Sequence, residues 1–387
     1  MNAAHENNWN LIRLMAALQV FYQHAAAWLE LPSMRNAPLI GEILFVAIEA
    51  LPGVAIFFVV SGFLVTQSFL AGPGGVGGFF WRRFLRIYPA LWIHYVVIFA
   101  ALMFGGAWSL SKLGDGATWK WIGGAFLIGS DWWGNIVAGN VSPFDWSSGI
   151  YARYPSGVLW TINAELGFYL LAPLVFAPLW RRFGVAWLIL LGAGAASLWF
   201  ALHVKYEVAS GAAVGNAIGF LRNQPGPYFW VFLIGGAVAL YWERLQFLFE
   251  GRALFWAAGY AALTLGDIFL LGNRYANINM VGLDALMLPR IVVLAGFVIS
   301  FAYSWRGVGA SVRKFDLSYA IYLYHMLVVW TLLGLGLKGQ IWIWPIALAL
   351  VLATAAASWF LVEKPMLGLK RLVSRPSVGE RSSTQNG

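Results

Sequence analysis

A chain of 387 residues that is 60% hydrophobic, 17% aromatic and only 11% charged is too apolar for an ordinary soluble domain, so its composition predicts a polytopic membrane protein. The formal charge of +9 does not indicate nucleic-acid binding, because no nucleic-acid motif accompanies it and membrane proteins concentrate such charge in cytoplasmic loops. The absence of cysteine excludes disulfides, thiolate catalysis and cysteine-ligated metal.

Ten apolar windows approach the ~20 residues that a helix needs to cross a bilayer, which predicts an all-α fold of about ten transmembrane helices. The windows lie at about 9–29, 51–70, 87–106, 158–178, 185–203, 227–242, 253–271, 286–304, 318–337 and 341–362. An even number of spans places both termini on one side of the membrane. With the N-terminus inside, the inner segments hold fifteen of the 25 lysine and arginine residues, which favours cytoplasmic termini.

We expect one membrane domain over residues 1–370, followed by a polar, disordered cytoplasmic tail over 371–387. The long loop 107–157 contains an apolar stretch, Trp119–Gly129, which is short and glycine-bearing. We therefore predict that this stretch is interfacial or re-entrant.

The first window carries Arg13 and, eleven residues later, His24. Eleven residues make about three helical turns, so both side chains lie on one face, roughly 16 Å apart along the axis. Ionisable residues in an apolar span usually face a cavity or the bundle interior, which makes this face a functional hypothesis. Alternatively, each side chain reaches out to the nearer membrane interface.

Arg82, Arg83 and Arg86 cluster on one helical face just before Pro89, which we expect to open the third membrane helix. Three guanidinium groups there suit a phosphorylated ligand, helped by the positive end of the helix that follows. The alternative is the ordinary anchoring of positive charge at the cytoplasmic face.

Glu165 lies about two turns inside the outer end of the fourth window. Counting from the outer boundary, Glu165 is roughly 10 Å deep and His24 roughly 8 Å deep, so the two can share a layer. A carboxylate beside a histidine raises the basicity of the imidazole and fixes its tautomer, as a general base for hydroxyl activation requires. The blander interpretation is that these polar groups only hold helices together.

The other polar candidates within the windows are His94, Asp267, Arg290 and His325. We expect His325 in the inner half of its helix, near the level of Arg13, and the other three to be structural. The five histidines show no spacing typical of a metal site, and the sequence contains neither a phosphate-binding loop nor a Gly-x-Ser-x-Gly turn.

Six segments, in order along nearly the whole chain, resemble the membrane acyltransferase-3 family. They are Arg13 with His24, Gly53-Val-Ala-Ile-Phe-Phe-Val-Val-Ser-Gly-Phe63, Arg83-Phe-Leu-Arg86 followed by Ile-Tyr-Pro, Leu159-Trp with Glu165 and Phe168-Tyr169, Ser318-Tyr319 with Tyr322 and His325, and Glu363-Lys-Pro365. Two departures stand out: Ala55 replaces an acid, usually Asp, and Trp9-Asn-Leu-Ile-Arg-Leu replaces the common Leu-Asp-Gly-Leu-Arg-Gly opening. Both departures keep the arginine and the histidine.

The resemblance implies a bacterial inner-membrane enzyme that moves an acyl group, often acetyl, from cytoplasmic acyl-coenzyme A to an acceptor at the outer face. Typical acceptors are hydroxyls of extracytoplasmic polysaccharides, lipid-linked sugars or peptidoglycan. The implied partners are acyl-coenzyme A, the glycan acceptor and the lipid bilayer, with no permanently bound cofactor, no metal and no nucleic acid. An oligomer, or a separate partner chain that completes the transfer, is compatible with the sequence.

Carried over residue by residue, the resemblance makes Arg13 and His24 the active pair and Glu165 the acid of the fourth helix. Arg83 and Arg86 become the grip on the coenzyme phosphates. Two further residues, Arg82 and His325, complete the predicted acyl-coenzyme A site.

We expect His24, supported by Glu165, to deprotonate an acceptor hydroxyl, and Arg13 to polarise the thioester carbonyl. Direct transfer and a covalent acyl-histidine both fit these residues. The competing hypothesis is a transporter or channel for a polar or lipid-linked solute, with Arg13, His24, Glu165 and Asp267 along its path. The missing internal repeat weighs modestly against it, and binding of coenzyme A would separate the two.

Overall fold

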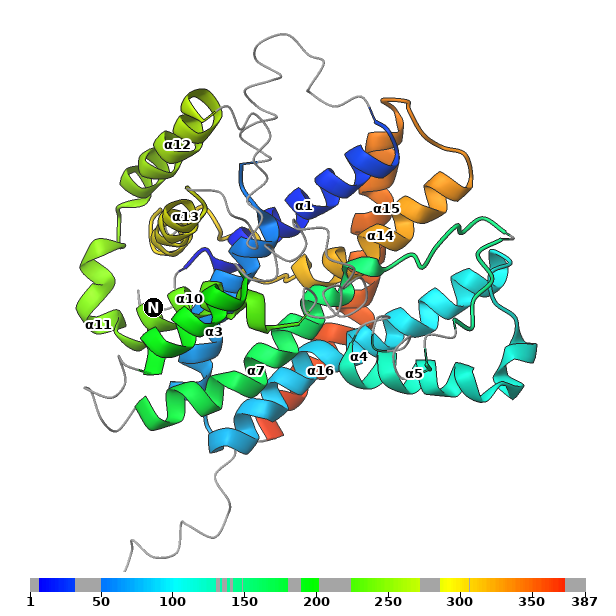
Figure 1. The fold of residues 1–387 in the computed structure, drawn as a ribbon, viewed down its shortest axis with the longest axis horizontal. Coiled ribbons are helices and arrows are strands. Elements are labelled where there is room, and N and C mark those ends of the chain that lie inside the picture. Colours follow the sequence, from blue (N-terminus) through cyan, green and yellow to red (C-terminus); the bar gives the residue numbers. More distant parts are fainter. Residues whose placement is uncertain are drawn as a thin grey trace, which may run out of the picture.

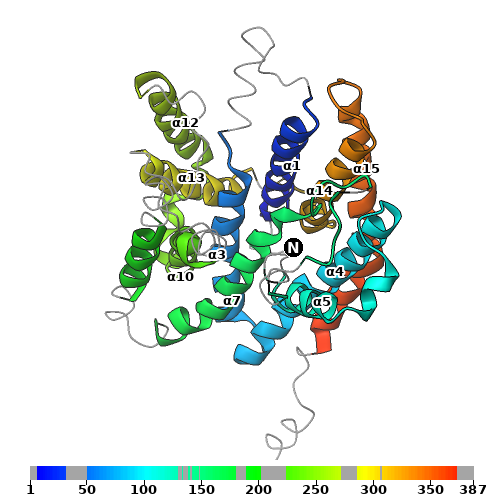
Figure 2. The same cartoon turned by 45° about the vertical axis from the view of Figure 1, so that its right-hand side comes forward.

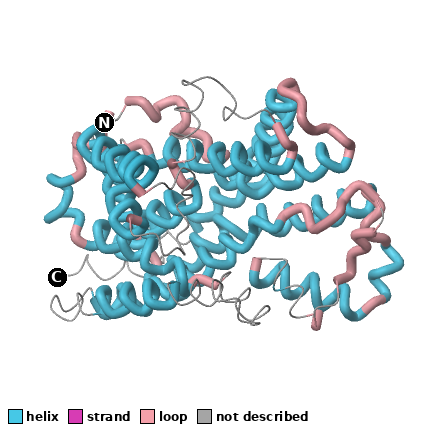
Figure 3. Tube along the Cα trace, turned by 45° about the horizontal axis from the view of Figure 1, so that its top comes forward, coloured by secondary structure: helices cyan, strands magenta, loops and turns pink. Residues whose placement is uncertain are grey.

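The chain folds into a bundle of helices, and the part of it that the structure describes contains no strand (Figure 3). The computed structural model describes residues 7–31, 50–129, 133, 138–139, 142–147, 149–179, 189–201, 224–271, 286–305 and 307–372. The main helices are α1 (Trp9–Trp28), α3 (Gly53–Ala71), α4 (Gly75–Phe104), α5 (Gly116–Ile128), α7 (Trp160–Leu179), α10 (Phe229–Leu240), α11 (Trp242–Leu245), α12 (Ala253–Leu270), α13 (Met287–Ala302), α14 (Ser318–Gly334), α15 (Ile343–Ser358) and α16 (Lys364–Gly368). A further helix covers Ile189–Ala201, and a π-helical turn, Trp359–Glu363, joins α15 to α16.

Each of the ten apolar windows contains a helix, although the start of the fifth window lies outside the described residues. Among the described helices, five are long and apolar enough to cross a membrane, or six if the segments Gly226–Leu240 and Trp242–Leu248, bent by 83°, form one span. A helical, multi-pass architecture is therefore confirmed for the described residues. The count of ten spans and the cytoplasmic location of the termini stay predictions.

Two central helices, α1 and α3, separate the bundle into two sides (Figures 1 and 2). On one side lie α10, α12 and α13, and on the other lie α4, α5, α14 and α15. Helices α3 and α10 approach closely because glycine removes the side chains at their crossing. A Cβ on Gly62 would lie 1.9 Å from the carbonyl oxygen of Phe232, and one on Gly235 would lie 2.1 Å from that of Val59. Such small-residue contacts are a usual means of packing helices inside a membrane.

Helix α4 corrects the prediction that Pro89 opens the third membrane helix. The helix begins at Gly75 and runs unbroken to Phe104, with Pro89 in its interior. Membrane helices tolerate an interior proline. Two residues before Pro89, the Tyr319 hydroxyl of α14 donates to the carbonyl of Ile87 at 3.0 Å and so fixes this part of α4 against its neighbour. The three arginines therefore lie within a continuous helix, without the positive helix end expected after them.

The expected interfacial or re-entrant segment forms α5, which folds back along α4 (Figure 1). Tyr88 donates to the carbonyl of Leu127 at 2.8 Å, and the Trp92 indole donates to that of Phe126 at 3.0 Å. The interfacial or re-entrant position of α5 in the membrane stays a prediction. Of the expected disordered tail, residues 373–387 lie outside the described part of the chain.

Candidate active site

Helices α1 and α14 run parallel to each other and together position the candidate site. Three side-chain pairs link α1 to α14 and to the loop just before it, in the same order along the chain. They are Arg13 with Asp316 of that loop at 2.5 Å, His24 with His325 at 2.9 Å, and Trp28 with Trp330 at 5.0 Å between ring centroids. These pairs define three successive levels of the bundle.

The middle level is a pair of histidines whose tautomers follow from their partners. Nδ1 of His325 lies 2.8 Å from the carbonyl oxygen of Tyr322 and 3.2 Å from that of Ile321. Carbonyl oxygens only accept hydrogen bonds, so in the neutral pair Nδ1 of His325 carries the hydrogen and its Nε2 is an acceptor. Nε2 of His325 faces Nδ1 of His24, which must therefore donate. This arrangement leaves the lone pair of His24 on Nε2, the form in which an imidazole acts as a base.

The histidine pair corrects two expectations from the sequence. His325 lies at the level of His24 and not at that of Arg13, because seven residues of helical rise, about 10 Å, separate it from Ser318, which lies just after Asp316. The expected pairing of His24 with Glu165 is also wrong. Glu165 accepts instead from Ser61 at 2.9 Å and from the Tyr169 hydroxyl, so His325 takes the orienting position predicted for the carboxylate.

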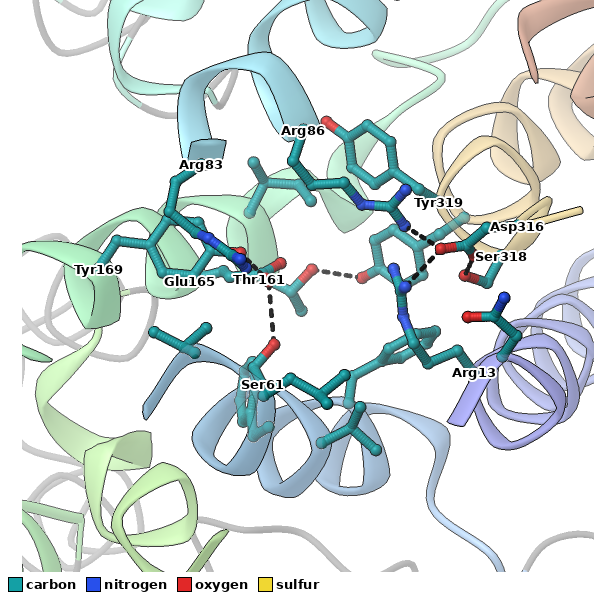
Figure 4. A pocket seen from close by; sticks show the side chains of 18 of the residues that line it. Arg13, Ser61, Arg83, Arg86, Thr161, Glu165, Tyr169, Asp316, Ser318 and Tyr319 are labelled. Carbon is teal, nitrogen blue, oxygen red and sulfur yellow. Dashed lines mark hydrogen bonds and ion pairs between the residues drawn. The ribbon is translucent and has the colours of Figure 1, made fainter. Parts of the chain in front are cut away.

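A cavity of about 470 Å³ occupies the bundle beside the first level (Figure 4). Its polar and charged lining is Asn10, Arg13, Ser61, Arg83, Arg86, Thr161, Glu165, Tyr169, Asp316, Ser318, Tyr319, Tyr322 and Lys370. Four cationic side chains thus face two carboxylates, which gives the cavity an excess of positive charge. Such a cavity suits an anionic ligand with a partly apolar body.

Asp316 ties two of the guanidinium groups together. Its Oδ2 lies 2.5 Å from Nη1 of Arg13 and 2.7 Å from Nη2 of Arg86, and its Oδ1 accepts from Ser318 at 2.6 Å. Burial alone would raise the pKa of Asp316, but the two guanidinium groups outweigh it and hold that pKa well below its ordinary value. Asp316 therefore keeps both arginines in place as an ionised carboxylate.

Arg83 lies across the cavity from the Asp316 cluster (Figure 4). Its Nη2 donates to the Ser68 hydroxyl at 3.0 Å, and its guanidinium lies 5.5 Å from the centroid of the Tyr169 ring. No carboxylate within the described ranges forms an ion pair with it. Arg82 turns away, since it donates to the carbonyls of Pro73 at 2.5 Å and Ser68 at 3.0 Å and is not among the residues that line the cavity.

Helix α7 supplies the third wall through residues one turn apart: Thr161, Glu165 and Tyr169. Thr161 donates to the Tyr322 hydroxyl at 2.6 Å, so α7 starts at the level of Tyr322, inward of the histidine pair. Glu165 is one turn deeper, which explains why it faces the arginines. Tyr322 both lines the cavity and contacts His325, with ring centroids 5.6 Å apart, and so borders both levels.

The far wall comes from the end of the chain's last apolar segment. Buried Glu363, in the π-helical turn, lies 3.9 Å from Nη1 of Arg86 and accepts from Ser358 at 3.3 Å. Single π-helical turns often occur at functional sites. Burial, followed by the nearby guanidinium groups of Arg86 and Arg83, lowers the pKa of Lys370 to about 8.

The remaining polar candidates lie outside this constellation. Asp267 and Arg290 form a buried ion pair between α12 and α13, and His94 forms a buried hydrogen bond with Ser156 at 2.9 Å. The polar path expected of a transporter, which included Asp267, is therefore not assembled. The described residues contain no group of histidines and acids able to hold a metal ion.

Sequence reasoning missed Asp316, Ser61, Glu363 and Lys370 as parts of the site. Glu363 was part of a recognised motif but received no role. Asp316 lies in the loop just before Ser318-Tyr319, where an acid at the arginine-bearing end of an apolar window was the available signal. The partner of Arg83, Ser68, gave no signal of its own.

Comparison with known proteins identifies relatives of the whole chain. A family described as "Acyltransferase domain" matches residues 6–363. Nodulation protein 10 of Rhizobium leguminosarum bv. viciae is 36% identical over 380 residues, which cover 97% of each chain. The peptidoglycan O-acetyltransferase OatA of Listeria monocytogenes serovar 1/2a is 35% identical over 127 residues, 31% of this chain and 19% of that protein. No solved structure matches the chain.

Proposed function

Since the chain belongs to the membrane acyltransferase-3 family and is an O-acyltransferase, we propose that it transfers an acyl group from cytoplasmic acyl-coenzyme A to a hydroxyl of an extracytoplasmic carbohydrate or lipid-linked sugar. The simplest acyl group is acetyl, and the proposed location is the bacterial inner membrane. A relative whose name specifies peptidoglycan O-acetylation supports a glycan acceptor.

One observation carries the proposal: a cationic cavity and an oriented histidine lie at two levels of the same helix. Arg13 and His24 are separated by roughly 16 Å along α1, about the length of an extended pantetheine arm. Phosphates held among Arg13, Arg83 and Arg86 would therefore leave the thioester near His24. The excess of positive charge in the cavity fits the phosphates at the nucleotide end of the donor.

The histidine pair provides the base. Nε2 of His24 takes the proton of the acceptor hydroxyl while the hydroxyl oxygen forms a C–O bond with the thioester carbonyl carbon. The C–S bond then breaks, and the departing thiolate takes the proton back from His24. A route through an acyl-histidine would use the same nitrogen. Neither route changes an oxidation state, so neither needs a redox partner.

This geometry changes the role proposed for Arg13. Arg13 is bound to Asp316, and its position on α1 lies roughly 16 Å from that of His24 along the axis, which places its guanidinium at a different level from the carbonyl on which the histidine acts. We assign Arg13 to the phosphates of the donor together with Arg86, and Glu165 to the cavity wall, where it fixes Ser61 and Tyr169.

Transfer of label from radiolabelled acetyl-coenzyme A to a glycan by membrane vesicles tests the proposal. We expect His24→Ala to abolish transfer, by at least the 10²- to 10⁴-fold typical of a general base, while coenzyme A binding stays intact. Gln23→Ala, the adjacent position on α1, is the matched control and should transfer normally. Transfer by His24→Ala at the wild-type rate would refute the role of His24 as the general base. Absence of coenzyme A binding by the wild type would refute acyl-coenzyme A as the donor.

A further inference from the structure

The third level of the α1–α14 contact lies one helical turn beyond the histidine pair. Trp28 follows His24 by four residues, so the two side chains lie on one face of α1, about 6 Å apart along the axis. The Trp28 ring packs on Trp330 and remains 36% exposed, whereas Trp330 is only 4% exposed. Trp28 therefore presents accessible aromatic surface one helical turn beyond the base.

The third member of this level is Arg153, which lies in the loop before α7. Its guanidinium carbon lies 5.0 Å from the centroid of the Trp28 ring and 5.3 Å from that of Trp330. Its side chain is exposed, and among the described residues no carboxylate pairs with it. By contrast, Lys338 at the same end of the bundle pairs with Glu30 at 2.9 Å.

The loop that carries Arg153 is fixed against α14 by two contacts. The Tyr151 hydroxyl lies 2.8 Å from that of Thr331, and the carbonyl oxygen of Ile150 approaches Gly334 so closely that a Cβ there would lie 2.2 Å away. Arg153 is therefore held on the two tryptophans by a rigid connection. Preorganised groups of this kind bind a ligand without a large ordering cost.

We propose that Trp28, Trp330 and Arg153 form the subsite that binds the sugar acceptor, an inference that rests on the proposed function. The apolar face of a pyranose ring stacks on an indole, and a guanidinium offers several N–H donors to ring hydroxyls. The spacing of about 6 Å between Trp28 and His24 is close to the width of one sugar ring. A sugar stacked on Trp28 thus presents a hydroxyl to Nε2 of His24, opposite the donor cavity.

An exposed tryptophan at a helix end also occurs as a simple membrane-interface anchor. Trp342, just before α15 and 49% exposed, lies at the same end of the bundle and has no part in this level, which makes it the matched control. An anchoring role predicts equal effects at the two positions, and an acceptor role predicts an effect at Trp28 alone.

The test compares transfer of labelled acetyl from acetyl-coenzyme A to an N-acetylglucosamine tetramer and to glycerol, which is too small to stack. We expect wild type and Trp342→Ala to have a higher kcat/KM for the tetramer than for glycerol. In Trp28→Ala this ratio should fall about tenfold, because the KM of the tetramer rises. Trp28→Phe should retain part of it, Arg153→Gln should weaken it, and the KM of acetyl-coenzyme A should not change in any variant.

An unchanged preference in Trp28→Ala, or equal losses in Trp28→Ala and Trp342→Ala, would overturn the subsite while leaving the transferase intact. Failure of the wild type to label either acceptor would overturn the proposed function and the subsite together. The two failures are therefore distinguishable.

Discussion

Two ion-pair systems, one buried and one beside the cavity, hold different parts of this bundle, and they differ in how their charges balance. Between α12 and α13, Asp267 faces Arg290, with exposed side-chain fractions of 0% and 2%. Beside the cavity, Asp316 faces both Arg13 and Arg86, with exposed fractions of 11% to 19% among the three. The first system sets one carboxylate against one guanidinium, and the second opens onto a cavity with surplus cations.

This difference separates a structural pair from a binding site. Two buried opposite charges that face each other compensate each other without a ligand. An arginine cluster that shares one carboxylate beside a cavity retains attraction for a further anion. The same contrast applies to the histidines: His94 is fully buried against Ser156, whereas His24 is only partly buried beside His325.

The largest effect should follow from breaking the closed pair. Asp267→Asn leaves the buried guanidinium of Arg290 uncompensated, which costs about 3–5 kcal/mol of stability. The double variant Asp267→Leu with Arg290→Met removes both charges and should recover most of that loss. Thermal unfolding of the purified protein measures both variants. If the double variant is as unstable as the single one, or is stable but inactive, the pair has a role beyond packing.

At the open system, the neighbouring arginines Arg82 and Arg83 provide a sharp comparison. Arg83→Ala removes a cavity guanidinium that has no carboxylate partner in the described part of the chain. It should raise the KM of acetyl-coenzyme A about ten- to a hundredfold, as charged hydrogen bonds are worth about 1.5–3 kcal/mol. Arg82→Ala removes contacts to the α3–α4 turn and should leave that KM nearly unchanged. Equal losses of coenzyme A affinity in Arg82→Ala and Arg83→Ala would instead support the predicted role of Arg82 in binding the donor.

The next effect concerns the orientation of His24. His325→Phe removes the acceptor for Nδ1 of His24 and should lower kcat about ten- to a hundredfold without changing the KM of acetyl-coenzyme A, because the tautomer is no longer fixed. His325→Gln offers an amide oxygen in place of Nε2 and should restore much of the rate. His94→Gln serves as the control and should leave kcat unchanged. A rise in the KM of acetyl-coenzyme A would instead support the donor-binding role predicted from the sequence.

The sequence predicted where helices form better than which side chains meet. All ten apolar windows contain helix, because apolar length is a local property of the chain. Counting residues also gave the separation of Arg13 and His24 along α1 correctly, since the rise per residue is constant. It could not give the lateral neighbours of a helix, so His24 was paired with Glu165 and not with His325.

Depth counting failed for Glu165 although the predicted start of the fourth window agrees with the helical segment that begins at Gly157, because that end lies deeper in the bundle than the count assumed. Glu165 was counted from an outer boundary near Gly157, yet Thr161 already lies at the level of Tyr322. Asp316 was missed for another reason, because loop carboxylates are common and only the fold brings this one to Arg13 and Arg86. Charge clusters were found where they are consecutive in the chain and missed where they are assembled from distant segments.

The smallest expected effect is a pH dependence set by Lys370, which adds positive charge to the cavity below about pH 8. As the pH rises through that value the ammonium loses its proton, so the KM of acetyl-coenzyme A should rise about two- to fivefold, as a partly solvated charge pair contributes up to ~1 kcal/mol. Lys370→Met should show a raised KM at pH 7 that changes little up to pH 9.

Stability should respond to Lys370 in the opposite direction. A lysine whose pKa falls from 10.5 to about 8 on folding binds fewer protons in the folded state between these values, so wild-type stability rises with pH across that window. Lys370→Met should remove this rise and increase the unfolding temperature at pH 7. A variant that weakens donor binding while stabilising the protein would mark Lys370 as a charge retained for its ligand, in contrast to the charge-balanced pair of Asp267 and Arg290.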